Sequence, residues 1–139
     1  MRRLAVWAKI KDKDSARELM ALSVHIDNNT WKKEQMIKLM DKIEKNTKSG
    51  APIILAGDFN TAPDSSNYNI ITRNSWRDSY LGSDLKGLAT YPAKNPKIRI
   101  DHIIIHGQKI NVVSYQTIET FPLISDHLPV RVDFIIEEE

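Results

Sequence analysis

A short apolar run in the middle of the chain, from Pro52 to Asn60, ends in residues suited to chemistry. Four consecutive apolar residues, two of them isoleucine, lie between Pro52 and Gly57, which predicts a strand buried on both faces. An acid, an aromatic residue and an amide follow. Since alternate side chains of an extended chain point the same way, Asp58 and Asn60 are expected to share a face where the strand leaves the core. The alternative is that both residues simply begin a turn.

The positions before this run predict a hairpin followed by an amphipathic helix. Two mostly apolar segments flank a short polar turn, which is the pattern of two antiparallel strands. Met36, Met40 and Ile43 then recur at the spacing of one helix face, and Gly50 lies just beyond the predicted helix end. The predicted elements are strands over 3–10 and 18–26, a turn over 11–15, and a helix that begins after the capping residues 28–30.

The positions after the run predict a short helix, a long loop and three strands. The helix is expected to begin at Pro63 and to continue through Trp76. The segment 79–97 contains glycines and prolines but little periodicity, so it is predicted to be a surface loop, and long loops in compact domains often bind ligands. Apolar runs predict the strands 98–106, 110–117 and 130–136.

This order of elements predicts one α/β domain over residues 1–139, with a mixed, mostly antiparallel sheet and helices on one face. A chain of this length can bury a substantial core. The strands around 53–56 and 103–105 look apolar on both faces, however, and the two helices cover only one. Something else is therefore expected to cover the second face.

Composition narrows the function classes only a little. The apolar fraction of 41%, the charged fraction of 27% and the net charge of +2 are ordinary for a globular protein and neither demand nor exclude a polyanionic partner. The absence of cysteine excludes disulfides and thiolate metal sites. No apolar run approaches the roughly 20 residues of a membrane span. The first residues also lack the apolar region of a signal peptide, so localisation is left open.

Acidic and imidazole side chains recur where the predicted strands end. Four segments each contain an aspartate, and three of them add a histidine. One polar residue beside a turn usually has no function, but four such acids that point to a common cleft are hard to attribute to coincidence. Within an apolar strand, Asp101 also needs a hydrogen-bonding or charged partner. The four segments are His25-Ile26-Asp27, Asp58-Phe59-Asn60, Asp101-His102 and Asp126-His127.

Carboxylates, an amide and imidazoles without cysteine suit a hard divalent cation and phosphate-ester chemistry. An aspartate can orient water, an asparagine can bind a phosphoryl oxygen, and a His–Asp pair can position a base or neutralise a phosphate. Zinc bound by the four histidines is the alternative metal site. It is less favoured, because no two histidines lie four residues apart on a helix and acids outnumber them.

Read together, these segments resemble the endonuclease/exonuclease/phosphatase superfamily. The resemblance is carried by Gly-Asp-Phe-Asn at 57–60, Arg-Ile-Asp-His-Ile at 99–103 and Ser-Asp-His-Leu-Pro at 125–129. Residues 25–27 are similar to that family's His-Leu-Asp strand end, and Thr-Tyr-Pro-Ala at 90–93 is similar to small bacterial members. The resemblance covers essentially the whole chain. It implies half of a four-layer α/β/β/α sandwich and a hydrolase that cleaves phosphoesters with Mg²⁺ or Mn²⁺.

The resemblance also implies a role for each matching residue. Asp58 would orient or deprotonate the attacking water, and Asn60 would hold the phosphate and help to place Asp58. His127 would contact the phosphate, with Asp101 fixing its ring. The other expected site residues are Asp126 at the metal, His25 as a second phosphate ligand or proton donor, and Asp27, Tyr91 and Arg99 as candidate substrate contacts.

Only the C-terminal half of that family's domain is covered by the resemblance. Family members begin with a further half-domain, which carries an asparagine at a strand end and a glutamate that is the main metal ligand. No Gln-Glu segment of that kind precedes the predicted hairpin here. The resemblance therefore implies a truncated site, and it explains why one sheet face lacks a cover.

Three interpretations remain open. The chain is an enzyme whose site is truncated or completed by a second chain, a non-catalytic module that binds phosphate-bearing ligands or a protein, or a half-domain that forms a homodimer over its open sheet face. Compatible substrates include nucleic acid, phospholipid head groups, inositol phosphates and small phosphodiesters. Basic residues in or beside the long loop offer charge for a phosphate backbone, although such charges often only solvate a loop. They are Lys86, Lys94, Lys97 and Arg99.

Overall fold

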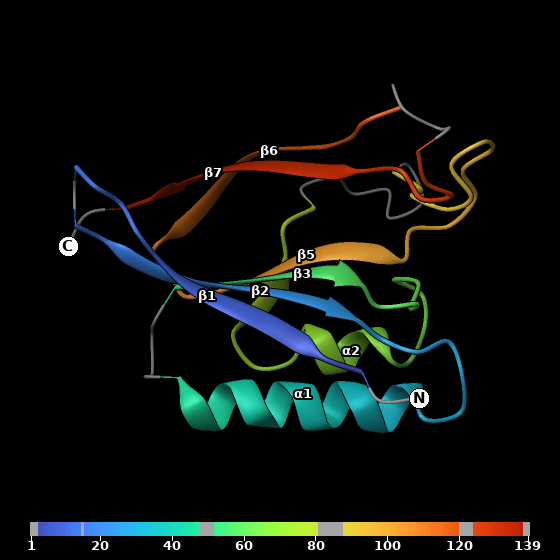
Figure 1. Cartoon of the computed structure of the whole chain (residues 1–139), viewed down its shortest axis with the longest axis horizontal. Coiled ribbons are helices and arrows are strands. Elements are labelled where there is room, and N and C mark those ends of the chain that lie inside the picture. The colour runs from blue at the N-terminus through green and yellow to red at the C-terminus, as the bar shows by residue number, and fades with distance from the viewer. Residues whose placement is uncertain (1–2, 15, 48–51, 81–87, 120–123, 138–139) are drawn as a thin grey trace.

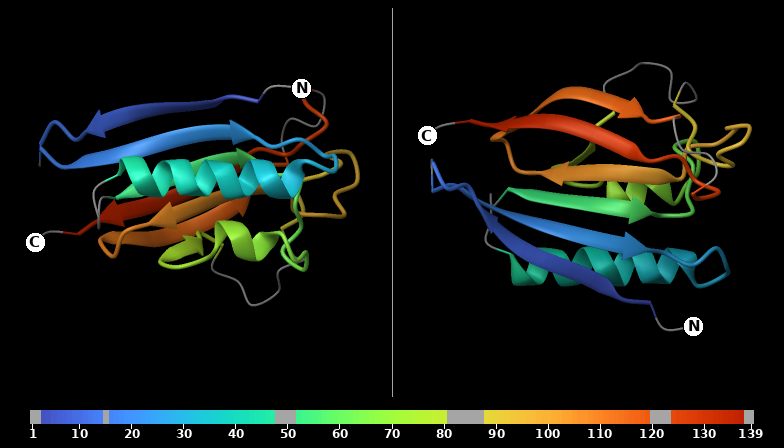
Figure 2. Two further views of the ribbon diagram at one scale, coloured as in Figure 1. Left: turned by 90° about the horizontal axis from the view of Figure 1, so that it is seen from below. Right: turned by 45° about the horizontal axis from the view of Figure 1, so that its top comes forward.

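The computed structural model describes residues 3–14, 16–47, 52–80, 88–119 and 124–137. Its elements are β1 Ala5–Lys11, β2 Glu18–His25, α1 Lys32–Asn46, β3 Ile53–Asp58, α2 Tyr68–Ile71, β4 Trp76–Asp78, β5 Asp101–His106, β6 Ile110–Thr117 and β7 Val130–Ile136. A five-stranded sheet in the order β1-β2-β3-β5-β4 forms the centre, and β6 and β7 form a separate two-stranded sheet (Figure 1). Both helices lie on one face of the central sheet (Figure 2).

Strand pairing brings the ends of three strands into one row. Among the described strands of the central sheet, β2 and β3 are parallel, and the other neighbours are antiparallel. This confirms the predicted mixed, mostly antiparallel α/β class. In the register, His25 pairs with Asp58, and Asp58 pairs with Asp101. Three candidate site residues therefore lie side by side at one end of the sheet.

The helix α1 connects the parallel strands β2 and β3 and covers the core. Two parallel strands need a crossover connection, and α1 supplies it. Its buried residues are Met36, Met40 and Ile43, as the helical spacing predicted. They pack in one cluster with apolar residues of β2, β3 and β5. Burial of each such side chain contributes about 2 kcal/mol of transfer free energy.

The second helix is much shorter than the sequence predicted. A helix from Pro63 through Trp76 was expected, but α2 covers only Tyr68–Ile71, and Trp76 begins strand β4 beside β5. Asn74 has a φ of 55°, in the left-handed region, so the helical path ends before it. Trp76 is buried and lies against the ring of His106. The apolar residues of this segment thus belong partly to a helix and partly to a strand of the sheet.

The face of the central sheet opposite the helices is covered in part. The sheet of β6 and β7 lies over β3 and β5 on that side (Figure 1), and β7 contacts β5. The edge strand β1 is open, with Val6 67% and Ile10 47% exposed. The sequence placed the last three strands in one sheet; the structure assigns two of them to a second layer. The four-layer sandwich stays a prediction.

The long segment predicted as a loop is held by backbone hydrogen bonds near its end. Residues 81–87, and with them Lys86, lie outside the described residues. Tyr91 forms an antiparallel bridge with Ile98, and the amide groups of Thr90 and Tyr91 both donate to the carbonyl of Ile98.

None of the described helices is long and apolar enough to cross a membrane.

Candidate functional site

Gly57 allows the strand end that carries Asp58 to lie against β2. Its φ is 149°, and a Cβ atom at this position would lie 1.9 Å from the carbonyl oxygen of Val24. Any other residue would therefore push β3 away from β2. Because β2 ends one residue later at His25, this close approach sets the separation between His25 and Asp58.

The turn after β3 holds the Asp58 carboxylate. Asn60 adopts a left-handed conformation with φ of 48°, which asparagine tolerates well. Its backbone N–H donates to Oδ1 of Asp58 at 2.7 Å, and its side-chain amide donates to Oδ2 at 3.2 Å and to the carbonyl of Ile26 at 2.8 Å. One proton of the side-chain amide thus holds Asp58, and the other ties the turn to Ile26. The sequence predicted that Asp58 and Asn60 would share one face of a strand. Because β3 ends at Asp58, their contact comes instead from the turn that follows the strand.

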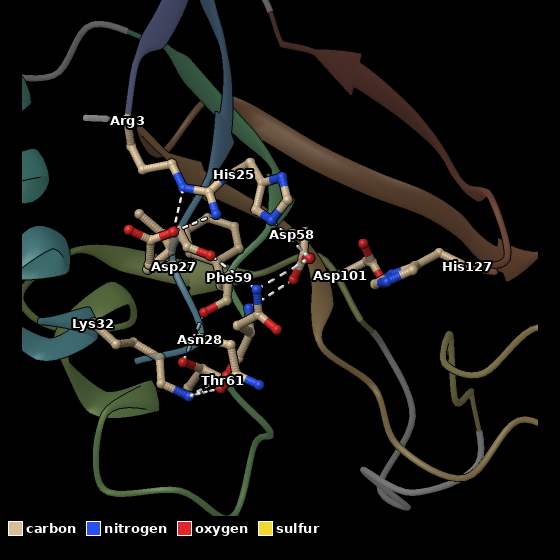
Figure 3. Close-up of polar contacts among 12 residues, drawn as sticks. Arg3, His25, Asp27, Asn28, Lys32, Asp58, Phe59, Thr61, Asp101 and His127 are labelled. Carbon is tan, nitrogen blue, oxygen red and sulfur yellow. Dashed lines mark hydrogen bonds and ion pairs between the residues drawn. The ribbon is translucent and has the colours of Figure 1, made fainter. Parts of the chain in front are cut away.

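Asp101 and His127 form a pair between β5 and the residues before β7. The Nδ1 atom of His127 lies 2.8 Å from Oδ2 of Asp101 (Figure 3). The ring of Tyr91 lies beside the imidazole, with 4.8 Å between ring centroids. The partner that an acid in an apolar strand requires is therefore His127, and Nε2 of that ring is left for a ligand.

Thr90 links the two sides of this pair. Its Oγ1 atom accepts hydrogen bonds from the N–H groups of Ile100 and Asp101, at 3.2 and 3.3 Å. Its carbonyl accepts from the N–H of Leu128 at 2.8 Å. Because Thr90 thus contacts the chain beside Asp101 and the chain beside His127, it sets their separation. Sequence reasoning gave Thr90 no role, since a threonine before a Tyr-Pro pair is an ordinary loop residue.

Asp58, Asp101 and His127 converge on one point. One ligand atom from each lies within 4.8 Å of the others, and all three residues are half-buried. His25 is more exposed, and its Nε2 atom lies 3.4 Å from Oδ2 of Asp58. Beside this cluster, a cavity of about 220 Å³ lies between the two sheets, bordered by β3, β5 and the start of β7. The end of the sheet therefore presents charged groups to an open space.

The electrostatics of the cluster favour a cation. Burial raises the pKa of the Asp58 carboxyl, and the negative charge of Asp101 raises it further, against the opposing effect of the Asn60 N–H. Burial opposes charging of His127, but its hydrogen bond to Asp101 outweighs this effect and raises the pKa of His127. A bound cation would relieve the repulsion between the carboxylates. Two carboxylate oxygens and one imidazole nitrogen are ligands that fit a divalent ion.

Asp126, the predicted metal ligand, lies beside this cluster without joining it. Its side chain is exposed, and its carboxylate is not among the converging ligand atoms of the described residues. Its carbonyl accepts a hydrogen bond from the N–H of Ala93 at 2.7 Å. In this structure the candidate ligands are Asp58, Asp101 and His127 instead.

Asp27 is buried away from the cluster and has other partners, and its contact with substrate stays a prediction. Its carboxylate pairs with Arg3 (Figure 3). It also accepts a hydrogen bond from Nε2 of Gln35 at 3.0 Å. Strand alternation predicted that Asp27 would face the same way as His25. However, β2 ends at His25, so the alternation ends there too.

Arg99, another predicted substrate contact, is buried in a second polar network. Its Nη1 donates to Oδ2 of Asp78 at 2.8 Å, and its guanidinium lies 4.8 Å from the centre of the Tyr80 ring. The same oxygen accepts from the hydroxyl of Tyr68 at 2.5 Å and lies 3.2 Å from Nδ1 of His102. Burial raises the pKa of Asp78, but these partners outweigh it and lower that pKa to about 2. Asp78 was not predicted from the sequence, because its partners Arg99 and His102 lie 21 and 24 residues away along the chain.

Comparisons of the sequence agree with this arrangement. A family model described as the endonuclease/exonuclease/phosphatase family matches residues 12–127. YbhP of Escherichia coli, an uncharacterized protein, is 17% identical over 132 residues, which is 95% of this chain and 52% of YbhP. The chain therefore spans about half the length of the curated relatives that it matches.

Comparisons of the structure give the same result. An endonuclease/exonuclease/phosphatase from Bacteroides vulgatus matches 97% of this chain and 56% of its own, with a TM-score of 0.78 and 28% identity. A mannosyl-6-phosphatase of Bacteroides thetaiotaomicron matches 96% and 57%, with a TM-score of 0.79 and 24% identity. The fold, the site and the match over 12–127 lead to one conclusion: the chain belongs to the endonuclease/exonuclease/phosphatase family.

Proposed function

We propose that this chain carries the phosphoester hydrolase site of its family and depends on a divalent metal. The convergence of Asp58, Asp101 and His127 is the observation that supports this most strongly. Asp58 would orient or deprotonate the attacking water, and a carboxylate with a raised pKa is a better base than an ordinary one. Asp101 would hold the ring of His127, whose Nε2–H would stabilise negative charge on the phosphoryl oxygens.

Asp58 and Asp101 would hold Mg²⁺ or Mn²⁺ through their carboxylate oxygens, and Asp126 would add a further carboxylate beside them, while His127 stays the hydrogen-bond donor to the phosphate. The ion would act as a Lewis acid that polarises the phosphoryl group. The glutamate ligand that the family resemblance implies is not part of the described cluster. We therefore expect weaker metal binding and slower hydrolysis than in a family member with the complete ligand set.

Two further rings border the cluster. His25 reaches Asp58 from the solvent side, and Tyr91 lies against His127. His25 would bind the phosphate or protonate the leaving group, and Tyr91 would contact the group esterified to it. Because a fold relative is named a mannosyl-6-phosphatase, sugar phosphates belong among the substrates to test, beside phosphodiesters.

The test is hydrolysis of p-nitrophenyl phosphate and of bis-p-nitrophenyl phosphate, with Mg²⁺, Mn²⁺ or EDTA. Asp58→Asn and His127→Ala should each lower the metal-dependent rate by at least about 100-fold. Asp14→Asn, at the opposite end of the hairpin, is the matched control and should keep full activity. An inactive but folded wild type, or equal rates in all variants, would contradict the proposal.

A second candidate function follows from the open face of β1, where Val6 and Ile10 are exposed. A half-domain that pairs with itself would bury this face, because large apolar patches are association sites. Light scattering should then report a dimer that Val6→Lys converts to a monomer. A folded monomer that binds no hydrophobic dye would contradict this alternative. The remaining non-catalytic interpretation would then be a module that binds phosphate-bearing ligands.

A further inference from the structure

Two side chains from different elements bind consecutive carbonyl groups in the turn after Asp58. The Nζ atom of Lys32, in the first turn of α1, donates to the carbonyl of Asn60 at 2.5 Å. The Nε2 atom of His102, on β5, lies 2.7 Å from the carbonyl oxygen of Thr61. Since a carbonyl oxygen only accepts hydrogen bonds, Nε2 of His102 carries a proton. Both contacts lie behind Asp58, Asp101 and His127 and touch none of these three side chains directly.

The turn needs such support, because its conformation sets the direction of the Asp58 carboxylate. Asn60 donates to both carboxylate oxygens of Asp58, so a rotation of the Asn60 backbone moves Asp58 with it. Asn60 also has a φ of 48°, in a region that a side-chain-bearing residue keeps only when its surroundings hold it there. Lys32 and His102 hold the two peptide groups that follow.

Each of the two supports is itself anchored. Lys32 also donates to the side chain of Asn28 at 3.2 Å, which fixes the end of its long side chain (Figure 3). His102 is fully buried, with its ring against those of Phe59 and Tyr68 and with Nδ1 facing Asp78. A rigid imidazole on β5 and a tethered ammonium on α1 therefore hold the turn between them.

We infer that Lys32 and His102 are positioning residues, which hold the turn 59–61 so that the Asp58 carboxylate meets Asp101 and His127. The strand β5 thereby places both aspartates of the site. It carries Asp101 on one face, and from its other face His102 holds the turn that positions Asp58. The effect of Lys32 and His102 on the rate of catalysis rests on the proposed hydrolase function, whereas their effect on the conformation of the turn does not.

Lys32→Met, with Lys32→Arg as its conservative partner, tests the first support. Lys32→Met should lower kcat about tenfold with KM nearly unchanged, because Asp58 is displaced while the phosphate-binding groups remain. Lys32→Arg keeps a cationic donor and should restore most of kcat. Lys33→Met, at an exposed neighbouring position, is the control for loss of charge on α1. A Lys33→Met effect as large as that of Lys32→Met would overturn the inference.

His102→Asn and His102→Gln form a matched pair for the second support. The amide of Asn replaces Nδ1 and keeps the contact with Asp78, whereas the amide of Gln replaces Nε2 and keeps the contact with Thr61. His102→Gln should therefore retain more activity and stronger Mn²⁺ binding than His102→Asn, by about threefold or more. The reverse order would assign His102 to the Asp78 network alone and overturn its positioning role.

The chemical shift of the Asn60 amide proton gives a readout that needs neither metal nor substrate. This amide donates to Asp58 at 2.7 Å, so loss of either support should shift its resonance, while Lys33→Met should leave it unchanged. An unchanged Asn60 resonance in both Lys32→Met and His102→Asn would overturn the inference. If the wild type hydrolyses no phosphoester, the proposed function fails, and this resonance still decides whether the supports act on the turn.

Discussion

Two adjacent residues of β5 lead to two Asp–His pairs with opposite electrostatic character. Asp101 points to the open face of the sheet and lies 2.8 Å from Nδ1 of His127. His102 points to the helix side, where its Nδ1 lies 3.2 Å from Asp78. Both pairs use the same residue types at similar distances. One lies at the candidate site, and the other lies in the core.

Charge balance separates the two pairs. Asp78, with 10% of its side chain exposed, faces Arg99, a tyrosine hydroxyl and His102, and its pKa is lowered to about 2. The half-exposed cluster holds Asp58 and Asp101 against His127, and the pKa of Asp58 is raised. A balanced network needs no ligand, whereas an unbalanced one that reaches solvent favours a cation. Residue type alone therefore does not distinguish a structural Asp–His pair from a functional one.

The largest expected effect comes from removing the cation of the buried network. Arg99→Met should lower the free energy of unfolding by about 3–5 kcal/mol, because Asp78 is then left buried without its charged partner. Urea denaturation measures this, with Lys97→Met as the control. Adding Asp78→Asn to Arg99→Met should recover part of the loss. A loss below about 1 kcal/mol would mean that the network is not balanced by Arg99.

Acid should weaken the buried network over a defined pH range. The folded pKa of Asp78 is lowered from 3.8 to about 2, so the stability it contributes is present above about pH 4 and is lost as the pH falls toward 2. We expect wild type to lose about 2 kcal/mol more than Asp78→Asn across this range. Urea denaturation at a series of pH values checks the difference. Parallel pH profiles for the two proteins would contradict it.

In the open pair, Asp101→Asn should lower the pKa of His127, because the anionic hydrogen-bond partner is lost. A raised histidine pKa stabilises the fold at low pH, and this contribution disappears as the pH rises through the folded value. NMR titration of the His127 ring, assigned by comparison with His127→Ala, measures the shift. An unchanged midpoint would mean that Asp101 does not control the protonation of His127.

The smallest effect is expected at Asp58 without metal. Its raised pKa means that ionisation disfavours the folded state as the pH rises above the ordinary aspartate value. Asp58→Asn should therefore stabilise the metal-free protein at pH 7 and raise its Tm slightly. Thermal melts with EDTA and with Mn²⁺ test this. Equal Mn²⁺ stabilisation of wild type and Asp58→Asn would remove Asp58 from the proposed metal site.

The elements that could be predicted were those with a regular apolar period. Met36, Met40 and Ile43 predicted α1, because the buried face of a helix appears in the sequence as apolar residues three or four positions apart. The segment around Trp76 was misassigned, because a short apolar stretch fits a helix or a strand until a neighbouring strand pairs with it. The separate layer of β6 and β7 was missed for the same reason: strand pairing is a long-range choice.

The sequence by itself determined which side chains are available for chemistry, and it predicted that Asp58, Asp101 and His127 lie near strand ends. Only the tertiary structure decided which acids meet. Asp27 is buried because β2 ends before it, Arg99 pairs with Asp78, and Asp126 lies beside the cluster. The alternation of side chains holds only within one strand, whereas a contact such as Asp101 with His127 depends on how distant segments pack.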